Sequence, residues 1–326
     1  MANASLSKRT RAPSGRWFAD VNREHGRRAL RKILTNWQLY LFLLPTILYF
    51  LVFKYGPMYG IQIAFKDFVP TEGIWGSPWV GFEHFQRFFN SFQFGTLLRN
   101  TLVLSIYALV ISFPLPIFLS LLMNQFPVVR YRRLVQTVIY APTFISTVVL
   151  VGMINVFLSP RSGLINHLIV LLGGQPVQFM ASPDWFPSIY VWSGVWQGTG
   201  FATIVYMAAL ASVDPALHEA AIMDGASKWG RIRYVDLPAI MPTIIILLIL
   251  AVGNIMNVGF EKALLMQTPL NKPTSEIIQT YVYSLGLQRA QYSFSAAVGV
   301  FNSVVNLILL FMVNRFAKRV SDTSLW

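Results

Sequence analysis

Long apolar runs with almost no charge decide what this chain can fold into. Hydrophobic residues make up 55% of the 326 positions and charged residues only 12%, about half the charged share of a typical soluble domain. Each run is about long enough for a helix to cross ~30 Å of hydrocarbon. The apolar residues gather in six runs, near 37–53, 101–123, 134–158, 188–211, 239–260 and 294–314.

The spacing within the runs favours helices. None of them alternates apolar and polar residues with a period of two, as strands of a membrane β-barrel do. We therefore predict an all-α polytopic membrane protein with six transmembrane helices. One membrane domain over 36–320 accounts for all six runs.

The basic residues indicate how the spans are oriented. The net charge is +13, which could suggest a nucleic-acid partner, but the charge is unevenly distributed. With the N-terminus in the cytoplasm and six alternating spans, 18 Lys and Arg fall on the cytoplasmic side and 8 outside. This is the positive-inside bias. We therefore expect a multi-pass protein of the bacterial cytoplasmic membrane, with both termini cytoplasmic, contact with membrane lipid, and no nucleic-acid partner.

The segments outside the spans follow from this topology. Residues 1–35 form a basic cytoplasmic segment, and 321–326 form a cytoplasmic tail. Residues 1–35 are too long and too polar for a cleavable signal; they fit either a surface-bound segment or a disordered arm. The longest outer loop is 54–99. In it, phenylalanines recur at helical spacing, which predicts an amphipathic helix that anchors in the membrane interface: Phe82, Phe85, Phe88, Phe89 and Phe92.

The absences of known motifs narrow the function. The chain has no G-x-x-x-x-G-K-[ST] phosphate loop, no metal-ligand spacing of His or Cys, and no convincing set of catalytic residues. The six runs also contain no Asp, Glu, Lys, Arg or His. A proton- or voltage-driven transporter normally needs such a group at membrane depth. If this chain moves a solute, another protein supplies the energy.

Neutral polar residues in the runs are the candidates for a solute pathway. Asn254 and Asn257 are three residues apart and would share one face of the fifth helix. Asparagine in a span often holds helices together. Amides and aromatic rings are also what a sugar pathway needs, since they bind hydroxyls and pyranose faces without the desolvation cost of a charge. Both readings remain open for these residues.

The segment between the fourth and fifth runs predicts two short helices joined by a turn. Asp214 is a good N-cap and Pro215 suits the first helical position. Gly225 supplies a left-handed residue that ends the first helix. A second helix would begin near Ser227 and stop before Pro238. Such a loop on the cytoplasmic side suits protein docking.

The residues of this loop, 212–238, carry a resemblance to a known family. Glu219–Ala221, Asp224–Ala226 and Val235–Pro238, at this spacing, are similar to the EAA motif of binding-protein-dependent ABC importer permeases, which have Ile where this chain has Val235. In that family the loop forms a coupling helix seated on an ATPase subunit. The resemblance therefore assigns ATPase coupling to seven residues: Glu219, Ala220, Ala221, Asp224, Gly225, Leu237 and Pro238.

The resemblance extends to the carbohydrate, maltose-type branch. Residues 54–59 and 76–81 are further similar to the permeases of lipo-oligosaccharide and alginate importers. In the maltose type, sugar contacts come from a Trp-x-Gly-x-x-aromatic stretch, an Asn-x-x-Asn pair and a Tyr that is matched here one residue out of register. Phe201 replaces a Tyr, which implies another sugar geometry. The implied pathway residues are Tyr140, Trp196, Gln197, Gly198, Phe201, Asn254 and Asn257.

The resemblance also implies the other subunits and partners of the transporter. This chain would be a non-enzymatic permease subunit without a cofactor or metal of its own, and two partner ATPase subunits would bind ATP and Mg. A second homologous permease, an extracytoplasmic solute-binding protein and an oligosaccharide substrate complete the expected partners. The alternatives are a permease for a non-sugar solute, a stand-alone channel or secondary transporter, and a membrane-embedded enzyme.

Overall fold

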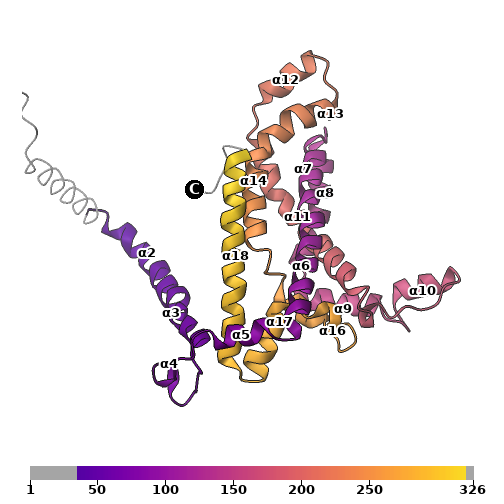
Figure 1. Ribbon diagram of the computed structural model, residues 1–326. Helices are drawn as coiled ribbons and strands as arrows, with labels where there is room; N and C mark the ends of the chain where they lie inside the picture. Colours follow the sequence, from indigo (N-terminus) through magenta and orange to yellow (C-terminus); the bar gives the residue numbers. More distant parts are fainter. Residues whose placement is uncertain (1–34, 321–326) are drawn as a thin grey trace, which may run out of the picture. The chain divides into compact units, whose positions relative to one another are not determined.

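The computed structural model describes residues 35–320, and these are mostly helical (Figure 1). Of the two predicted terminal segments, all but Thr35 lie outside the described residues. The elements up to the third apolar run are α2 (Trp37–Phe50), η1 (Leu51–Tyr55), α3 (Gly56–Met58), η2 (Tyr59–Phe65), α4 (Gly73–Gly76), α5 (Glu83–Phe89), α6 (Gln93–Ser112), α7 (Pro114–Asn124), α8 (Val129–Tyr140), η3 (Ala141–Phe144) and α9 (Thr147–Phe157). The later elements are α10 (Leu164–Leu171), η4 (Phe179–Ala181), α11 (Phe186–Ala211), α12 (Pro215–Met223), α13 (Lys228–Arg231), η5 (Ile232–Asp236), α14 (Leu237–Gly253), α15 (Phe260–Met266), α16 (Lys272–Ser275), α17 (Ile278–Tyr283), η6 (Ser284–Gln288) and α18 (Tyr292–Val320).

The described residues contain several helices of membrane-spanning length, which confirms the all-α polytopic fold. Four helical runs are long and apolar enough on their own: Trp37–Phe65, Gln93–Asn124, Lys228–Gly253 and Tyr292–Arg319. Two further pairs pass the same test only together, Val129–Phe144 with Thr147–Phe157 and Phe186–Ala211 with Pro215–Met223. Counting each bent pair as one span gives six. The exact number of six spans stays a prediction.

The chain divides into two units, Met1–Ile61 and Gln62–Trp326. In the first, residues 37–61 form one helical run, and no residue of α2 is buried. The second unit contains the packed core. Its central helix is α11, which contacts α6, α7, α8 and α14. One cluster of buried apolar side chains includes Leu104 of α6, Val151 of α9, and Phe186 and Val195 of α11.

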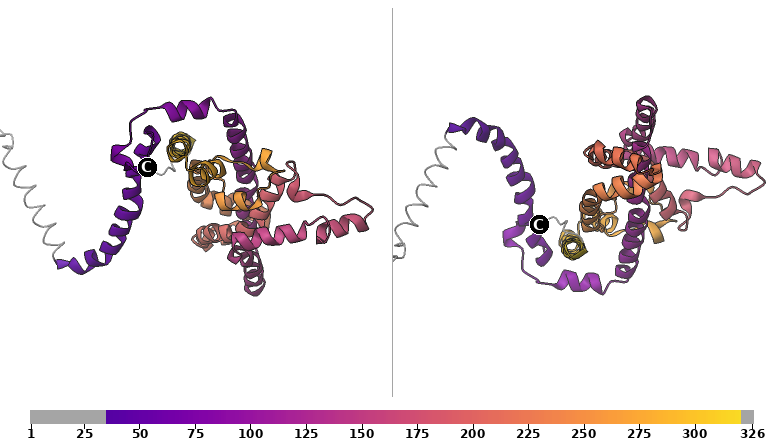
Figure 2. Two further views of the ribbon diagram at one scale, coloured as in Figure 1. Left: turned by 90° about the horizontal axis from the view of Figure 1, so that it is seen from below. Right: turned by 90° about the horizontal axis from the view of Figure 1, so that it is seen from above.

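Within the second unit the short helices gather at two opposite ends of the long ones. Helices α12 and α13 lie at one end, and α9, α16 and α17 lie at the other (Figure 1). Helix α10 projects sideways from the bundle in all three views (Figures 1 and 2). Asn166 holds the base of this arm, because its side-chain amide donates to the carbonyls of Leu158, Ser159 and Val177.

The third apolar run is bent more sharply than a proline kink predicts. Helix α8 ends at Tyr140, a 3-10 turn contains Pro142, and α9 leaves at 96°. Pro142 has no backbone N–H to continue the ladder of α8. Ser146 then starts a new helix, because its hydroxyl accepts a hydrogen bond from the backbone N–H of Val149 at 3.3 Å.

Two boundaries of the fifth apolar run differ from the expectation. The helix does not stop before Pro238 but runs unbroken from Lys228 to Gly253. A π-helical turn at Ile232–Asp236 comes just before the proline and widens the helix where a regular turn would clash with the ring. The helix also ends at Gly253, so Asn254 and Asn257 lie in a non-helical segment rather than on a helix face.

The phenylalanine-rich stretch of the outer loop forms the predicted helix, α5. Its membrane anchoring stays a prediction, since much of the stretch packs within the protein. Phe88 is only 1% exposed and its ring contacts the rings of Phe294 and Phe301 on α18. Phe92, by contrast, is 96% exposed. Phe88 therefore fixes the outer loop to α18, whereas Phe92, at the end of the phenylalanine-rich stretch, stays exposed.

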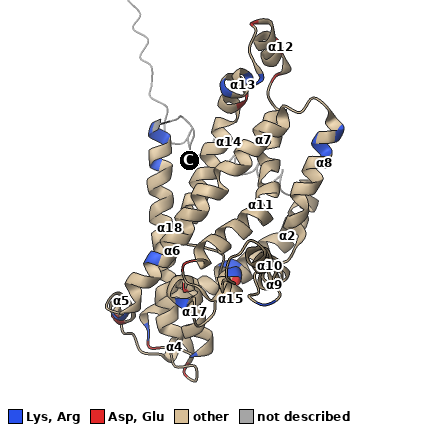
Figure 3. Ribbon diagram, turned by 90° about the vertical axis from the view of Figure 1, so that its right-hand side faces the viewer, with Lys and Arg blue, Asp and Glu red and all other residues tan. Residues whose placement is uncertain are grey.

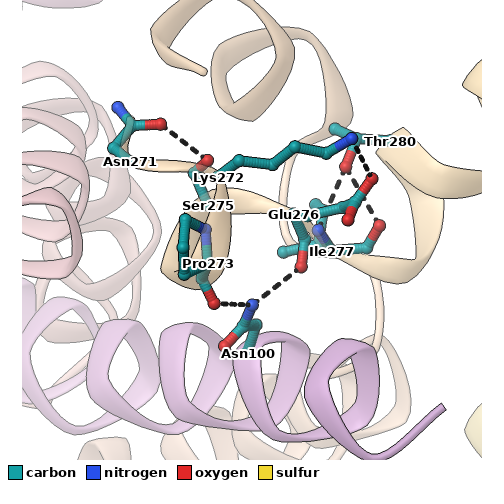
Figure 4. A network of polar contacts seen from close by, with 8 residues as sticks. All are labelled: Asn100, Asn271, Lys272, Pro273, Ser275, Glu276, Ile277 and Thr280. Carbon is teal, nitrogen blue, oxygen red and sulfur yellow. Dashed lines mark hydrogen bonds and ion pairs between the residues drawn. The ribbon is translucent and has the colours of Figure 1, made fainter. Parts of the chain in front are cut away.

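The connection from α15 to α18 is fixed to α6 by side-chain amides. Asn100 on α6 donates to the carbonyl oxygens of Pro273 at 2.8 Å and of Glu276 at 3.0 Å (Figure 4). Asn271 is fully buried, and its carboxamide oxygen accepts from the hydroxyl of Ser275 at 2.8 Å (Figure 4). The two bonds from Asn100 satisfy backbone carbonyl groups at the end of α16, which a helix leaves unpaired.

The contact between α8 and α11 predicts opposite effects for two glycines of α11. A Cβ at Gly200 would overlap the backbone of Ile139, whereas a Cβ at Gly198 would meet nothing within 4 Å. We expect Gly200→Ala to lower the thermal midpoint of the purified protein, since overpacking costs about 1–3 kcal/mol. Gly198→Ala should be neutral or stabilising, because alanine favours helix. Equal midpoints for the two variants would contradict this packing.

Candidate functional site

The loop between α11 and α13 folds locally as its sequence predicts. The carboxylate of Asp214 accepts a hydrogen bond from the backbone N–H of Ala216 at 2.9 Å, and Pro215 opens α12. Gly225 has φ of +76° and ends that helix. The hydroxyl of Ser227 caps α13 by accepting from the backbone N–H of Gly230 at 3.1 Å. The predicted helix, turn and second helix start are therefore confirmed.

Helix α12 offers a free surface at its end of the bundle. None of its residues is buried, and Met223 is 87% exposed. Leu217 and Ile222 are exposed as well. Of the seven residues assigned to coupling, Glu219, Ala220, Asp224 and Gly225 are exposed and Ala221 is partly exposed. Leu237 and Pro238 lie apart from them, at the start of α14.

A buried carboxylate joins α12 to two long helices. Asp236 is fully buried and lies just before α14. Its oxygens accept hydrogen bonds from the amides of Asn124 at 3.1 Å and Gln125 at 2.7 Å, both at the end of α7. His218 of α12 places its Nε2 3.3 Å from the same carboxylate. Sequence reasoning treated Asp236 only as part of the motif, although an acidic residue at the start of an apolar helix was a signal.

A cavity of about 410 Å³ brings together three of the predicted pathway residues, Gln197, Asn254 and Asn257. Its walls come from α6, α11 and the non-helical segment after α14, with Lys262 of α15 as a further lining residue. Backbone outside a helix is tolerated at membrane depth only where protein or a water-filled cavity satisfies it. The break after Gly253 meets this condition, because Asn254, Ile255, Asn257 and Val258 line the cavity.

The three amides are positioned by hydrogen bonds. Gln197 donates to the carbonyl oxygen of Ile145 at 2.7 Å. The carboxamide oxygen of Asn257 accepts from Gln279 at 2.9 Å and from Asn302 at 3.1 Å. Asn254 donates only within its own segment, to Leu250, at 3.3 Å. Asn257 thus ties three segments together, whereas the hydrogen bonds of Asn254 stay within its own segment, to Leu250 and Asn257.

The other predicted pathway residues lie outside this cavity. Trp196, Gly198 and Phe201 are exposed along α11. Phe201 is one turn beyond Gln197 and so shares its face of the helix. Tyr140 is the last residue of α8, half-buried and beside Gly200. The structure therefore groups the amides in the cavity and leaves the aromatic residues outside its lining.

Two residues of the cavity were missed by the sequence reasoning. The hydroxyl of Tyr190 donates to the carbonyls of Val258 and Gly259, which fixes the non-helical segment against α11. Lys262 donates from its ammonium to the backbone carbonyl of Tyr190 at 2.6 Å. The left-handed φ of +80° at Gly259 marks the return to helix. Nothing in the sequence marked this return to helix, because Gly259 lies within the fifth apolar run.

Comparison with known proteins gives extensive similarity. Protein LplB of Bacillus subtilis is 46% identical over 288 residues, covering 88% of this chain and 91% of that protein. The polygalacturonan/rhamnogalacturonan transport system permease protein YteP of the same species is 44% identical, covering 93% and 95%. A crystal structure of a bacterial ABC transporter that imports the acidic polysaccharide alginate matches with a TM-score of 0.83 and 43% identity, covering 90% of this chain and 99% of that chain.

These matches confirm the resemblance to the ABC importer permeases, and they favour a permease over a stand-alone channel or an enzyme. The family described as "Binding-protein-dependent transport system inner membrane component" matches residues 113–322, which include α12, the cavity amides and α18. The chain therefore belongs to the family of inner-membrane components of binding-protein-dependent transport systems.

Proposed function

We propose that this permease carries saccharide oligomers inward, driven by a separate ATPase. The observation that carries the proposal is the cavity where Gln197, Asn254 and Asn257 meet beside the break in a long helix. Amide groups can donate to and accept from hydroxyls, and they need no ion pair to be buried. The names of the relatives, which refer to polygalacturonan, rhamnogalacturonan and alginate, agree with such a substrate.

The exposed aromatic residues of α11 fit the same role. Trp196 and Phe201 present apolar ring faces, and such faces stack on the apolar sides of pyranose rings. In a complete transporter they would face the second permease subunit across the pathway. Tyr140 and Gly198 would line the same stretch. The pathway would then be shared, with amides from this cavity and rings from the facing surface.

The exposed surface of α12 is the proposed contact with the ATPase. Its apolar residues Leu217, Ile222 and Met223 are exposed, and Glu219 adds a carboxylate. An apolar patch with a polar rim is typical of a protein interface. ATP and Mg would be bound by two ATPase subunits. Closure of the ATPase pair would then move α12 and open the pathway outward as a rigid-body change.

The charge distribution supports the proposed orientation. Lys and Arg lie at the α12 end on α8, α13 and α18 (Figure 3). Positively charged residues favour the cytoplasmic side. The α12 end would therefore face the cytoplasm, as contact with an ATPase requires, and both termini would lie there. The opposite end, with α15, α16 and α17, would meet the extracytoplasmic solute-binding protein.

Reconstitution tests the proposed function directly. The protein would be placed in liposomes with its partner permease, both ATPase subunits and the binding protein encoded with it. We expect uptake of a labelled saccharide oligomer that requires ATP inside and binding protein outside. Uptake without ATP would contradict the proposal, and uptake of an amino acid or peptide instead of a saccharide would assign another solute.

Gly225 provides the first test of the coupling role. A valine there would be forced into the left-handed region, at a cost of about 1–2 kcal/mol, and would change the turn after α12. We expect Gly225→Val to reduce ATP hydrolysis stimulated by the binding protein several-fold while the chain still inserts. Gly230→Ala in α13 is the control, because its Cβ would meet only ordinary contacts at 3.6 Å. Wild-type stimulation in Gly225→Val would contradict the coupling assignment.

Asp236 provides a second test, through the link from α12 to α7. In Asp236→Asn one side-chain amide would face the donors of Asn124 and Gln125. An unsatisfied buried donor costs about 1–3 kcal/mol. We expect a lower thermal midpoint and fewer saccharide molecules imported per ATP hydrolysed. Asp184→Asn, at an exposed carboxylate, should change neither. An unchanged transport ratio in Asp236→Asn would show that this link does not transmit motion.

Replacing each of the two cavity asparagines by leucine should have different effects on uptake and on assembly. Asn254→Leu should lower saccharide uptake while the complex still assembles, because that side chain bonds only within its own segment. Asn257→Leu should lower both uptake and the yield of assembled complex, because Gln279 and Asn302 lose their acceptor. Uptake assays and size-exclusion chromatography measure the two effects. Wild-type uptake in Asn254→Leu would remove that residue from the pathway.

A further inference from the structure

The cavity contains a buried lysine that the permease mechanism outlined above does not use. Lys262 is 8% exposed, although lysine is among the residues least often buried. Its ammonium donates to the carbonyl of Tyr190 at 2.6 Å and lies 4.7 Å from the centre of the Tyr190 ring. A buried ammonium is costly unless it is paired with an opposite charge. A carbonyl and a ring face only partly replace that pairing.

Among residues 35–320, no carboxylate lies within 4 Å of this ammonium. The ion pairs in this range are His218–Asp236 and Lys272–Glu276. Glu261, next in sequence, is exposed. A lysine ammonium has three N–H donors, and the hydrogen bond to Tyr190 uses one. Lys262 therefore keeps positive charge and donor capacity that these residues do not match.

The surroundings keep the ammonium open to the cavity. Gly194 lies beside it, and a Cβ at that position would be 3.1 Å from Nζ. Ser105 lines the same cavity, and its hydroxyl is buried with no hydrogen-bond partner among the described residues. Lys262 is the only charged residue among those lining the cavity. An unmatched cation and an unmatched hydroxyl thus share a space with three amides.

The ammonium is charged at the pH of a cell. Lys262 lies outside the candidate spans, and burial lowers its pKa to about 8, because the ammonium loses hydration. The protonated form still dominates at neutral pH. A neutral sugar in this cavity would leave that charge uncompensated, whereas a sugar carrying a carboxylate would pair with it. Charge-assisted hydrogen bonds of this kind are about twice as strong as neutral ones.

We propose that Lys262 makes this pathway selective for anionic saccharides, by pairing its ammonium with the carboxylate of a uronate residue held by Gln197 and Asn254. This inference rests on the saccharide function proposed above and narrows it to one substrate class. The hydroxyls of the same sugar residue would meet the amides and Ser105. The carboxylate would use the two ammonium donors left by Tyr190.

The test uses the complete importer in liposomes and two probes of equal length, trigalacturonate and its fully methyl-esterified, neutral form. Lys262→Met removes the charge and keeps the length of the side chain, and Lys262→Arg keeps the charge. Lys272→Met is the matched control, since Lys272 is a half-exposed lysine of the neighbouring α16 outside the cavity. Each variant is compared with wild type on the same probe, so that any preference of the binding protein cancels.

We expect Lys262→Met to lower uptake of trigalacturonate about tenfold and to leave uptake of the methyl ester unchanged. Lys262→Arg and Lys272→Met should stay close to wild type on both probes. An equal loss on both probes would show that Lys262 only ties α15 to α11, and no loss on either would remove it from the pathway; both results overturn the inference. Wild-type uptake of the methyl ester alone would overturn it while the saccharide function stands. Uptake of neither probe would overturn both.

Discussion

The hydrogen bond from the Tyr190 hydroxyl to the carbonyl of Val258 stabilises the break after α14, on which the cavity depends. A helix that ends inside a membrane protein exposes carbonyl groups with no water to satisfy them, and each unsatisfied group costs several kcal/mol. The chain stops its helix at Gly253 and does not resume it until Phe260. Tyr190 satisfies carbonyl groups in this break. Asn306 also contributes, because its side-chain oxygen accepts a hydrogen bond from the backbone N–H of Met256 at 3.0 Å. Without the break there would be no cavity between α6, α11 and α15.

The buried polar groups of the second unit are of two kinds, neutral and charged, and their burial differs in its free-energy cost. The amides around the cavity are neutral, so burying them costs little once they are hydrogen-bonded. Asp236 and Lys262 are ionisable residues, and different partners surround each of these buried side chains. Asp236 is surrounded by three donors from α7 and α12, as a structural carboxylate requires. Lys262 has one carbonyl and one ring face as partners, so its charge is less fully compensated than that of Asp236.

Local signals in the sequence were enough to predict the α12 loop but not the cavity. Asp214, Pro215 and Gly225 act within one turn of the chain, so their roles could be predicted without knowing what packs nearby. Pro238 misled the same reasoning, because a π-helical turn before a proline depends on packing around Ile232 and Asp236, both buried. The end of the helix at Gly253 could not be predicted from hydropathy, because the sequence stays mostly apolar up to Phe260. Lys262 looked like an ordinary loop residue, because nothing in the sequence places it against Tyr190.

Two stiff helices connect the exposed loop to the cavity. Helix α11 carries Gln197 and ends at Ala211, only three residues before α12 begins at Pro215. The helical run from Lys228 to Gly253 begins within the same loop and ends where Asn254 enters the cavity. The carboxylate of Asp236 ties that run to His218 of α12. If α12 is the contact with the ATPase proposed above, a movement of α12 would reach both walls of the cavity through these two helices. The break after Gly253 is the compliant point, and it lies beside the residues that would hold the cargo.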